Sequence, residues 1–423
     1  MKEKSLTGNM HPNLPVYIGD DALTHLIGFC QEQGYTKFLL VADENTYLAL
    51  GQSVQAALQE EDCDVVLALL QGKDVIADER YLMQVFLAAD QQERVYLAVG
   101  SGTITDITRF VSHRVRAPFI SVPTAPSVDG FTSIGAALIV GGMKKTYVTQ
   151  APAAVFADLP TLCAAPHRLI AAGFGDLLGK LVSTADWKMD HILHNGPYVD
   201  SISQRLREAA ISSAGQVAAI GRGLPQGVHS LMEGLIESGF SMLDYGNTSP
   251  CSGAEHHISH YWEVKLLREG RPAILHGAKV GVATAITAGW YELVRQYRRE
   301  EVARLLEKAQ LPPVEAQIQE LRAVYGALAD DILAEQAQYI RMSQEEFERL
   351  KKRIVERWDQ VLQIAAGVPP SEQFQEWLCQ AGAPLDGSEI GLSKEEVELG
   401  KRFGHFYSQR FSINKLRLLL GLS

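Results

Sequence analysis

Short apolar runs alternate with amphipathic stretches over the first part of the chain. A stretch with helical periodicity, around 46–60, follows the first of these runs. The apolar runs have the length and composition of buried strands, and they cover residues 37–43, 63–70, 94–100, 118–124 and 154–158. Strands that alternate with helices indicate a parallel sheet covered on both faces, so we predict an α/β domain.

The pattern changes after Gly130. Apolar stretches at 136–140 and 145–149 flank Gly141 and Gly142, which predicts a hairpin. From Pro160 onward strand signals fade and helical periodicity takes over.

Two serines in this later part have capping-box spacing, Ser343 with Glu346 and Ser393 with Glu396. We therefore predict two domains with a cleft between them. Residues 1–160 are expected to form an α/β nucleotide-binding domain, and residues 161–423 an all-helical domain.

Composition narrows the class of protein. The 423 residues suffice for two domains, and 46% apolar with 21% charged residues is an ordinary globular balance. The formal net charge of −11, with no polybasic run, argues against nucleic acid or an anionic membrane as partner. No run approaches the roughly 18 apolar residues of a membrane span.

Two further features point to the cytoplasm. The initial MKEKSLTGNMHPN has no apolar core behind its positive charge, so it is not a secretory signal. The five cysteines are scattered, with no CxxC pair, which favours free thiols in a reducing compartment. We expect a cytoplasmic protein without membrane insertion.

A glycine-containing loop, VGSGTITD (99–106), joins a predicted strand to a predicted helix. Gly100 and Gly102 allow a sharp turn and close approach to a diphosphate, beside the positive end of a helix dipole. The motif is neither GxGxxG nor GxxxxGKS, so a plain turn is an equal alternative. Asp43 ends the first strand, where it could accept hydrogen bonds from a ribose or cap a turn or helix.

A second loop, VPTAPSVDGFTS (122–133), combines two prolines with several hydroxyl side chains. The prolines stiffen the loop, and Thr124, Ser127 and Ser133 can donate hydrogen bonds to phosphate or amide oxygens. This composition predicts a rigid ligand-binding loop.

Three segments carry metal-ligand side chains. GFGDLLGK (173–180) places Asp176 at a predicted helix start, His256 and His260 share one face of a helix, and His276 follows a break at Arg271-Pro272. Two imidazoles and one carboxylate form a site that leaves a position for a substrate oxygen. The alternative is that these histidines are ordinary core or surface residues, paired with neighbours such as Glu255.

The two loops and GFGDLLGK, together with EHHISH (255–260) and LHGAKVG (275–281), resemble the motifs of the sn-glycerol-1-phosphate dehydrogenases, in particular their bacterial, arabinose-operon-type branch. That family belongs to the dehydroquinate synthase-like and iron-containing alcohol dehydrogenase superfamily. The resemblance covers roughly residues 14 to 290, and the remainder agrees only in its helical character. The resemblance implies a dinucleotide-binding Rossmann-like domain and a helical domain that binds metal and substrate, with the active-site cleft between them. It also implies a homo-oligomer, with a dimer favoured.

The resemblance also implies roles for individual residues. A divalent metal (zinc, nickel or iron) would be held by Asp176, His256 and His276, and the substrate would be contacted by Asp129 and His260. NAD or NADP would be bound by Asp43, Gly102, Thr103, Ile104, Thr105, Asp106, Thr124, Ala125, Pro126, Ser127 and Ser133. Two positions depart from or complicate the pattern: Ser101 replaces the middle glycine of the superfamily's loop, and His257 lies beside His256.

The implied reaction is reversible hydride transfer at C2 between sn-glycerol 1-phosphate and dihydroxyacetone phosphate. Candidate donors to the phosphate are Lys144, Lys145, Lys180 and Lys279, although any one lysine could simply be solvated. Three alternatives stay open. They are a dehydrogenase of unphosphorylated glycerol, a carbocycle-forming lyase resembling dehydroquinate synthase (a branch with Glu in place of Asp176), and a catalytically silent NAD-binding protein.

Overall fold

The computed structural model describes residues 14–72, 74–141 and 143–422. The initial segment 1–13, for which we predict no secretory signal, and Gly142 of the predicted turn lie outside the described residues. Contacts group the described chain into two compact units of two segments each. The first extends to Leu177 and also contains Ser212–Thr248, whereas the second contains Leu178–Ile211 and the chain from Ser249 onward.

This division into units differs from the predicted single domain boundary at residue 160. Residues 212–248 join the first unit because helix α11 (Pro225–Tyr245) packs against strand β1 (Val16–Gly19) and helix α6 (Leu159–Ala164). The domain boundary at 160 stays a prediction, as does the cleft.

A six-stranded sheet in the order β1-β8-β5-β4-β2-β3 forms the centre of the first unit, and all of its strand pairs are parallel. This confirms the predicted parallel sheet. The strands are β1 (Val16–Gly19), β2 (Lys37–Asp43), β3 (Asp64–Leu70), β4 (Val95–Val99), β5 (Phe119–Val122) and β8 (Ala154–Asp158). The sequence analysis missed β1, a four-residue edge strand too short to show a pattern.

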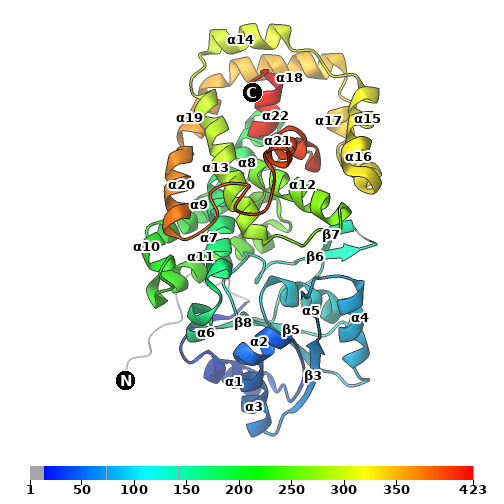
Figure 1. Cartoon of the computed structure of the whole chain (residues 1–423), viewed down its shortest axis with the longest axis vertical. Coiled ribbons are helices and arrows are strands. Elements are labelled where there is room, and N and C mark those ends of the chain that lie inside the picture. The colour runs from blue at the N-terminus through cyan, green and yellow to red at the C-terminus, as the bar shows by residue number, and fades with distance from the viewer. Residues whose placement is uncertain (1–13, 73, 142, 423) are drawn as a thin grey trace. The chain divides into compact units, whose positions relative to one another are not determined.

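Helices cover both faces of the sheet (Figure 1). In β2, Phe38 and Leu40 belong to the core under α1 and α3, whereas Leu39 and Val41 belong to the core under α4 and α5. Alternate side chains of a strand point to opposite faces, so an unbroken apolar run is what a doubly covered strand requires. The helices are α1 (Ala22–Gln33), α3 (Gln52–Glu60), α4 (Glu79–Ala88) and α5 (Gly102–Val115).

Two smaller features complete the first unit. The helical stretch predicted after β2 is present as α2 (Glu44–Thr46), a π-helical turn (Tyr47–Gly51) and α3. The predicted hairpin is also confirmed, as strands β6 (Gly135–Val140) and β7 (Met143–Val148) pair antiparallel. The remaining helices are α6 (Leu159–Ala164), α7 (His167–Leu178), α10 (Val217–Ile220) and α11, while α9 (Asp200–Ala214) passes from the second unit into the first.

The described residues of the second unit contain helices and no strand, which confirms the predicted helical character. Both predicted capping boxes are present, at Ser343 and Ser393. The further helices are α8 (Lys180–His194), α12 (Ala254–Arg268), α13 (His276–Val294), α14 (Arg299–Lys308), α15 (Val314–Tyr325), α16 (Ala329–Glu335), α17 (Ala337–Ile340), α18 (Gln344–Glu356), α19 (Trp358–Ala366), α20 (Ser371–Gln380), α21 (Lys394–Phe403) and α22 (Ile413–Leu419). Short 3-10 turns lie at Ser249–Cys251, Gly326–Leu328 and Gly404–Tyr407.

Two further features of the described chain bear on its surroundings. None of the described helices combines the length and the apolar character that crossing a bilayer demands. All five cysteines carry free thiols, as predicted.

Asp176 is not at a helix start, and that prediction is wrong. It lies in the last turn of α7, with Gly173 inside the same helix. A Cβ on Gly173 would be 1.8 Å from the carbonyl oxygen of Pro126. The glycine therefore marks a close approach between helix and loop rather than a break before a helix.

We predict that Gly173→Ala destabilises the protein by about 1–3 kcal/mol, because the added methyl group forces helix and loop apart. The matched control is Gly28→Ala in α1, where a Cβ meets nothing within 4 Å. That change should stabilise by roughly 0.5–1 kcal/mol through helix propensity. Chemical unfolding of both variants measures the difference, and equal effects would contradict the packing role of Gly173.

Candidate metal and cofactor site

Two aspartates of the first unit lie together. Asp176 is fully buried, and its Oδ2 accepts a hydrogen bond from the backbone N–H of Asp129 at 3.2 Å. The Asp129 carboxylate in turn accepts from the hydroxyl of Ser238, on α11, at 2.8 Å. The structure thus brings the predicted metal ligand Asp176 beside the predicted substrate contact Asp129, and Ser238 and the backbone fix both.

Three histidine rings of the second unit form one cluster. His256 and His260 lie on α12, and His276 is the first residue of α13. The ring centroids are separated by 5.2 Å for His256 and His276, 5.7 Å for His260 and His276, and 6.1 Å for His256 and His260. The predicted common face of His256 and His260 is therefore present.

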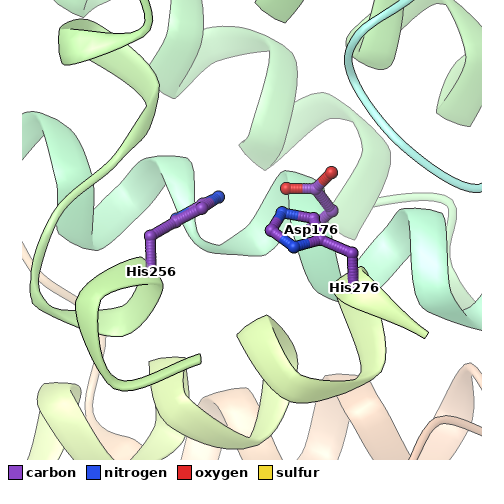
Figure 2. A group of neighbouring side chains, drawn as sticks. All are labelled: Asp176, His256 and His276. Carbon is purple, nitrogen blue, oxygen red and sulfur yellow. The ribbon is translucent and has the colours of Figure 1, made fainter. Parts of the chain in front are cut away.

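Asp176, His256 and His276 each present one ligand atom, and these atoms lie within 4.8 Å of one another. Figure 2 shows the Asp176 carboxylate beside the ring of His276, with the His256 ring directed toward both. Two imidazoles and a carboxylate at such spacing suit a divalent transition metal. All three predicted ligands are brought together.

His257 differs from its neighbour. It is buried and is not one of the three grouped ligands. Burial, together with nearby cations such as Arg410, holds the pKa of His257 well below its usual value. These observations favour His256 over His257 as the ligand.

A second group, His260, Glu263 and His276, also has ligand spacing. However, the Nζ of fully buried Lys279 lies 3.2 Å from Glu263. An ammonium group at this position disfavours another cation. The two groups share His276, and the first group is the better candidate site for one ion. The ring of Tyr407 stacks on His260 at a centroid distance of 4.5 Å.

The buried carboxylates around α12 are held by backbone amides. Asp186 on α8 accepts hydrogen bonds from Ala254 N–H and Ile413 N–H, both at 2.7 Å. It also accepts from the Tyr291 hydroxyl at 2.6 Å. Burial, reinforced by nearby Glu255, raises the pKa of Asp186 to about 7.

The predicted cofactor loops meet at one edge of the parallel sheet. β4 lies beside β2 although β3 comes between them in sequence, so the chain reverses direction across the sheet at this pair. Dinucleotides bind outside the carboxyl ends of strands at such a switch point. Asp43 ends β2, and Gly100 and Gly102 follow β4 into α5.

The glycine loop and the hydroxyl-rich loop contact each other directly. Thr124 N–H donates to the carbonyl of Gly100 at 3.3 Å, and the hydroxyls of Ser101 and Ser127 are hydrogen-bonded. Ser101 has φ −93° and ψ −154°, an extended conformation open to any residue. A serine at this position therefore needs none of the conformational freedom of glycine.

Other predicted cofactor residues have local structural partners. Asp43 accepts from Thr46 N–H at 2.8 Å and caps α2, which was the alternative interpretation of this residue. Ser133 donates to the Gly130 carbonyl at 3.2 Å. Gly102, Thr103, Thr105 and Asp106 form the first turn of α5 with Ile104, whose side chain packs in the sheet core.

Sequence reasoning missed Arg109, which fixes the hydroxyl-rich loop. This fully buried guanidinium donates to the carbonyls of Gly130 at 2.5 Å, Phe131 at 3.0 Å and Gly135 at 2.7 Å. It also pairs with Asp106 at 3.1 Å. Burial raises the pKa of Asp106 to about 6 and lowers that of Arg109 to about 10. The sequence did offer one signal for this role, because Arg109 is a charged residue on the buried face of an amphipathic helix.

Comparisons with known proteins define the class first. A family model described as iron-containing alcohol dehydrogenase matches residues 17–166. The solved structure of an iron-containing alcohol dehydrogenase from Corynebacterium glutamicum has a TM-score of 0.57 and 15% identity, over 99% of this chain and 96% of that one. The fold is that of the iron-containing alcohol dehydrogenases.

Sequence relatives then define the family. The glycerol-1-phosphate dehydrogenase, NAD(P)+, of Geobacillus stearothermophilus is 35% identical over 98% of this chain and 94% of its own length. The protein of the same name from Geobacillus thermodenitrificans is 44% identical over 69% of this chain and 74% of its own. The chain belongs to the glycerol-1-phosphate dehydrogenase family, which confirms the resemblance found in its motifs.

We predict that Arg109→Gln lowers the free energy of unfolding by about 3–5 kcal/mol, because it leaves the partly buried Asp106 and several carbonyls without their buried cation. Arg114→Gln is the control, since Arg114 is exposed on the same helix and its guanidinium lies over the Phe110 ring. That change should cost less than about 1 kcal/mol. Comparable losses in urea unfolding would contradict the role of Arg109.

Proposed function

We propose that this chain is an NAD(P)-dependent and metal-dependent oxidoreductase that interconverts sn-glycerol 1-phosphate and dihydroxyacetone phosphate. The observation that carries the proposal is the convergence of Asp176, His256 and His276. Membership of the glycerol-1-phosphate dehydrogenase family supports the substrate. The complete ligand set speaks against a silent NAD-binding protein, and Asp176 speaks against the lyase branch.

Asp176, His256 and His276 hold one divalent metal in this proposal. When bound, the metal supplies Lewis-acid polarisation of the C2 oxygen, and the nicotinamide supplies the hydride chemistry. Zinc, nickel and iron all accept this donor set. The cofactor residues are those of the two loops at the sheet edge, together with Asp43.

Asp129 and His260 orient the substrate and carry its proton. The Nδ1 of His260 lies 3.4 Å from Glu263, a weak hydrogen bond that favours a proton on Nδ1. The other ring nitrogen is then able to exchange a proton with the substrate hydroxyl. The hydroxyl of Ser238 holds the Asp129 carboxylate in one orientation.

Among the four candidate lysines, Lys279 is the favoured donor to the substrate phosphate. Its Nζ is beside Glu263, the residue that contacts His260. Lys180 is also buried, but it donates to the carbonyl of Cys251 at 3.3 Å. Lys144 and Lys145 lie on β7 of the hairpin.

The remaining parts of the proposal concern the protein in the cell. We infer a cytoplasmic enzyme of small phosphorylated metabolites that acts as a homo-oligomer, with a dimer favoured. The cysteine usage and acidic net charge of −11 support this setting.

Asp176→Asn and His276→Ala should each reduce turnover at least about a thousandfold, since they remove several kcal/mol of charge stabilisation. NADH oxidation with dihydroxyacetone phosphate measures this. The exposed controls Asp359→Asn and His25→Ala should keep full activity.

The fold and the cofactor affinity of both metal-site variants should stay close to those of the unchanged protein. A chelator should abolish the wild-type activity, and zinc, nickel or iron should restore it. Full activity in either metal-site variant after chelation would refute the assignment.

The substrate is tested by comparing glycerol 1-phosphate with glycerol as reductants of NAD+ and NADP+. We expect a much higher kcat/KM for the phosphorylated substrate, because the buried ammonium of Lys279, which already pairs with Glu263, would also attract the anionic phosphate. Lys279→Met should remove this preference with little effect on the rate with glycerol. A higher kcat/KM for glycerol would favour the alternative, a polyol dehydrogenase.

Chiral analysis of the product formed from dihydroxyacetone phosphate identifies the enantiomer, which is expected to be sn-glycerol 1-phosphate.

A further inference from the structure

We propose that Glu255 is a positioning residue for the metal site: its carboxylate accepts a hydrogen bond from Nδ1 of His256, so that Nε2 is presented to the metal. This inference rests on the proposed function, because it assumes that His256 is a ligand. In this proposal Glu255 itself contacts neither the metal nor the substrate.

The contact is short and buried. Oε1 of Glu255 lies 2.7 Å from Nδ1 of His256, and the Glu255 side chain is fully buried. The exposed fraction of the His256 side chain is only 6%. A carboxylate can only accept, so the ring nitrogen that faces it must carry the hydrogen. The tautomer with its lone pair on Nε2 is thereby selected.

The acceptor is itself held in place. The same Oε1 accepts from the backbone N–H of Gly253 at 2.8 Å, so the Glu255 side chain folds back over the start of α12. A Cβ on Gly253 would lie 2.7 Å from Oε2 of Glu255 and 2.8 Å from Oδ2 of Asp186. Glycine at 253 is therefore the residue that lets both carboxylates approach the first turn.

Asp186 holds the next amide of that turn. It accepts from Ala254 N–H at 2.7 Å, and a hydroxyl and a second amide complete its partners. The turn that carries His256 thus has two consecutive amides bound to buried carboxylates. This arrangement fixes the backbone beneath the ring as well as the ring itself.

The pair formed by His260 and Glu263 provides a contrast. Its atoms are 3.4 Å apart, both side chains are 18–19% exposed, and Glu263 also pairs with Lys279. Glu255 is shielded from water and holds His256 at a shorter distance. A buried, charge-assisted hydrogen bond is the stronger of the two.

A carboxylate behind a ligating histidine fixes the ring and raises its basicity, and its loss typically weakens metal binding 10–100-fold. We therefore expect Glu255→Gln to weaken Zn²⁺ binding by about 10–100-fold. The measurement is competition of the metal-free protein with a chromophoric zinc chelator. Circular dichroism and thermal unfolding without metal verify that the variant is folded.

Glu233→Gln is the matched control, because Glu233 pairs with Nδ1 of His229 at 3.3 Å on a more exposed helix surface. It should leave the Zn²⁺ affinity unchanged. Unchanged affinity in Glu255→Gln, with His256→Ala strongly weakened, would overturn the role of Glu255 and leave the metal site intact. Unchanged affinity in His256→Ala would instead refute the proposed metal site.

A second measurement needs no Glu255 variant. The nitrogen NMR spectrum of the metal-free protein with ¹⁵N-labelled histidine should show a protonated Nδ1 for His256, assigned by its disappearance in His256→Ala. A proton on Nε2 instead would overturn the proposal.

Discussion

Carboxylates buried away from water must be matched by hydrogen-bond donors, and this constraint organises the site in the helical unit. Asp186 and Glu255 are both fully buried, and each accepts a hydrogen bond from a backbone amide at the start of α12, Glu255 from Gly253 and Asp186 from Ala254. Because those amides belong to the turn that carries His256, satisfying the carboxylates also places the imidazole. The position of this ligand is thus a consequence of backbone hydrogen bonding.

The same principle operates in the α/β unit with the charges reversed. There the buried cation Arg109 binds the carbonyls of the loop that contains Asp129. The backbone of Asp129 in turn donates to Asp176, which is presented from the end of α7. In the α/β unit a guanidinium binds loop carbonyls, and in the helical unit carboxylates bind backbone amides. These hydrogen bonds fix the backbone near the residues of the proposed metal site.

The sequence predicted the periodic elements well, because a doubly covered sheet requires apolar runs and capping boxes have a fixed spacing. It also identified the three proposed metal ligands, whose ligand atoms the structure brings together. It failed where tertiary packing decides. Gly173 indicated a loop before Asp176, yet it lies inside α7, where the Pro126 carbonyl leaves no room for a side chain. Glu255 was considered only as an alternative to metal binding, since spacing alone does not show that one histidine can have both partners.

The central claim is that one cation is shared by Asp176, His256 and His276. Anomalous diffraction from crystals of the nickel-loaded protein tests it most directly. The account predicts a single strong peak per chain, bonded to a carboxylate oxygen of Asp176, to Nε2 of His256 and to a ring nitrogen of His276. A peak at another set of side chains, or no peak near these three under saturating nickel, would contradict it.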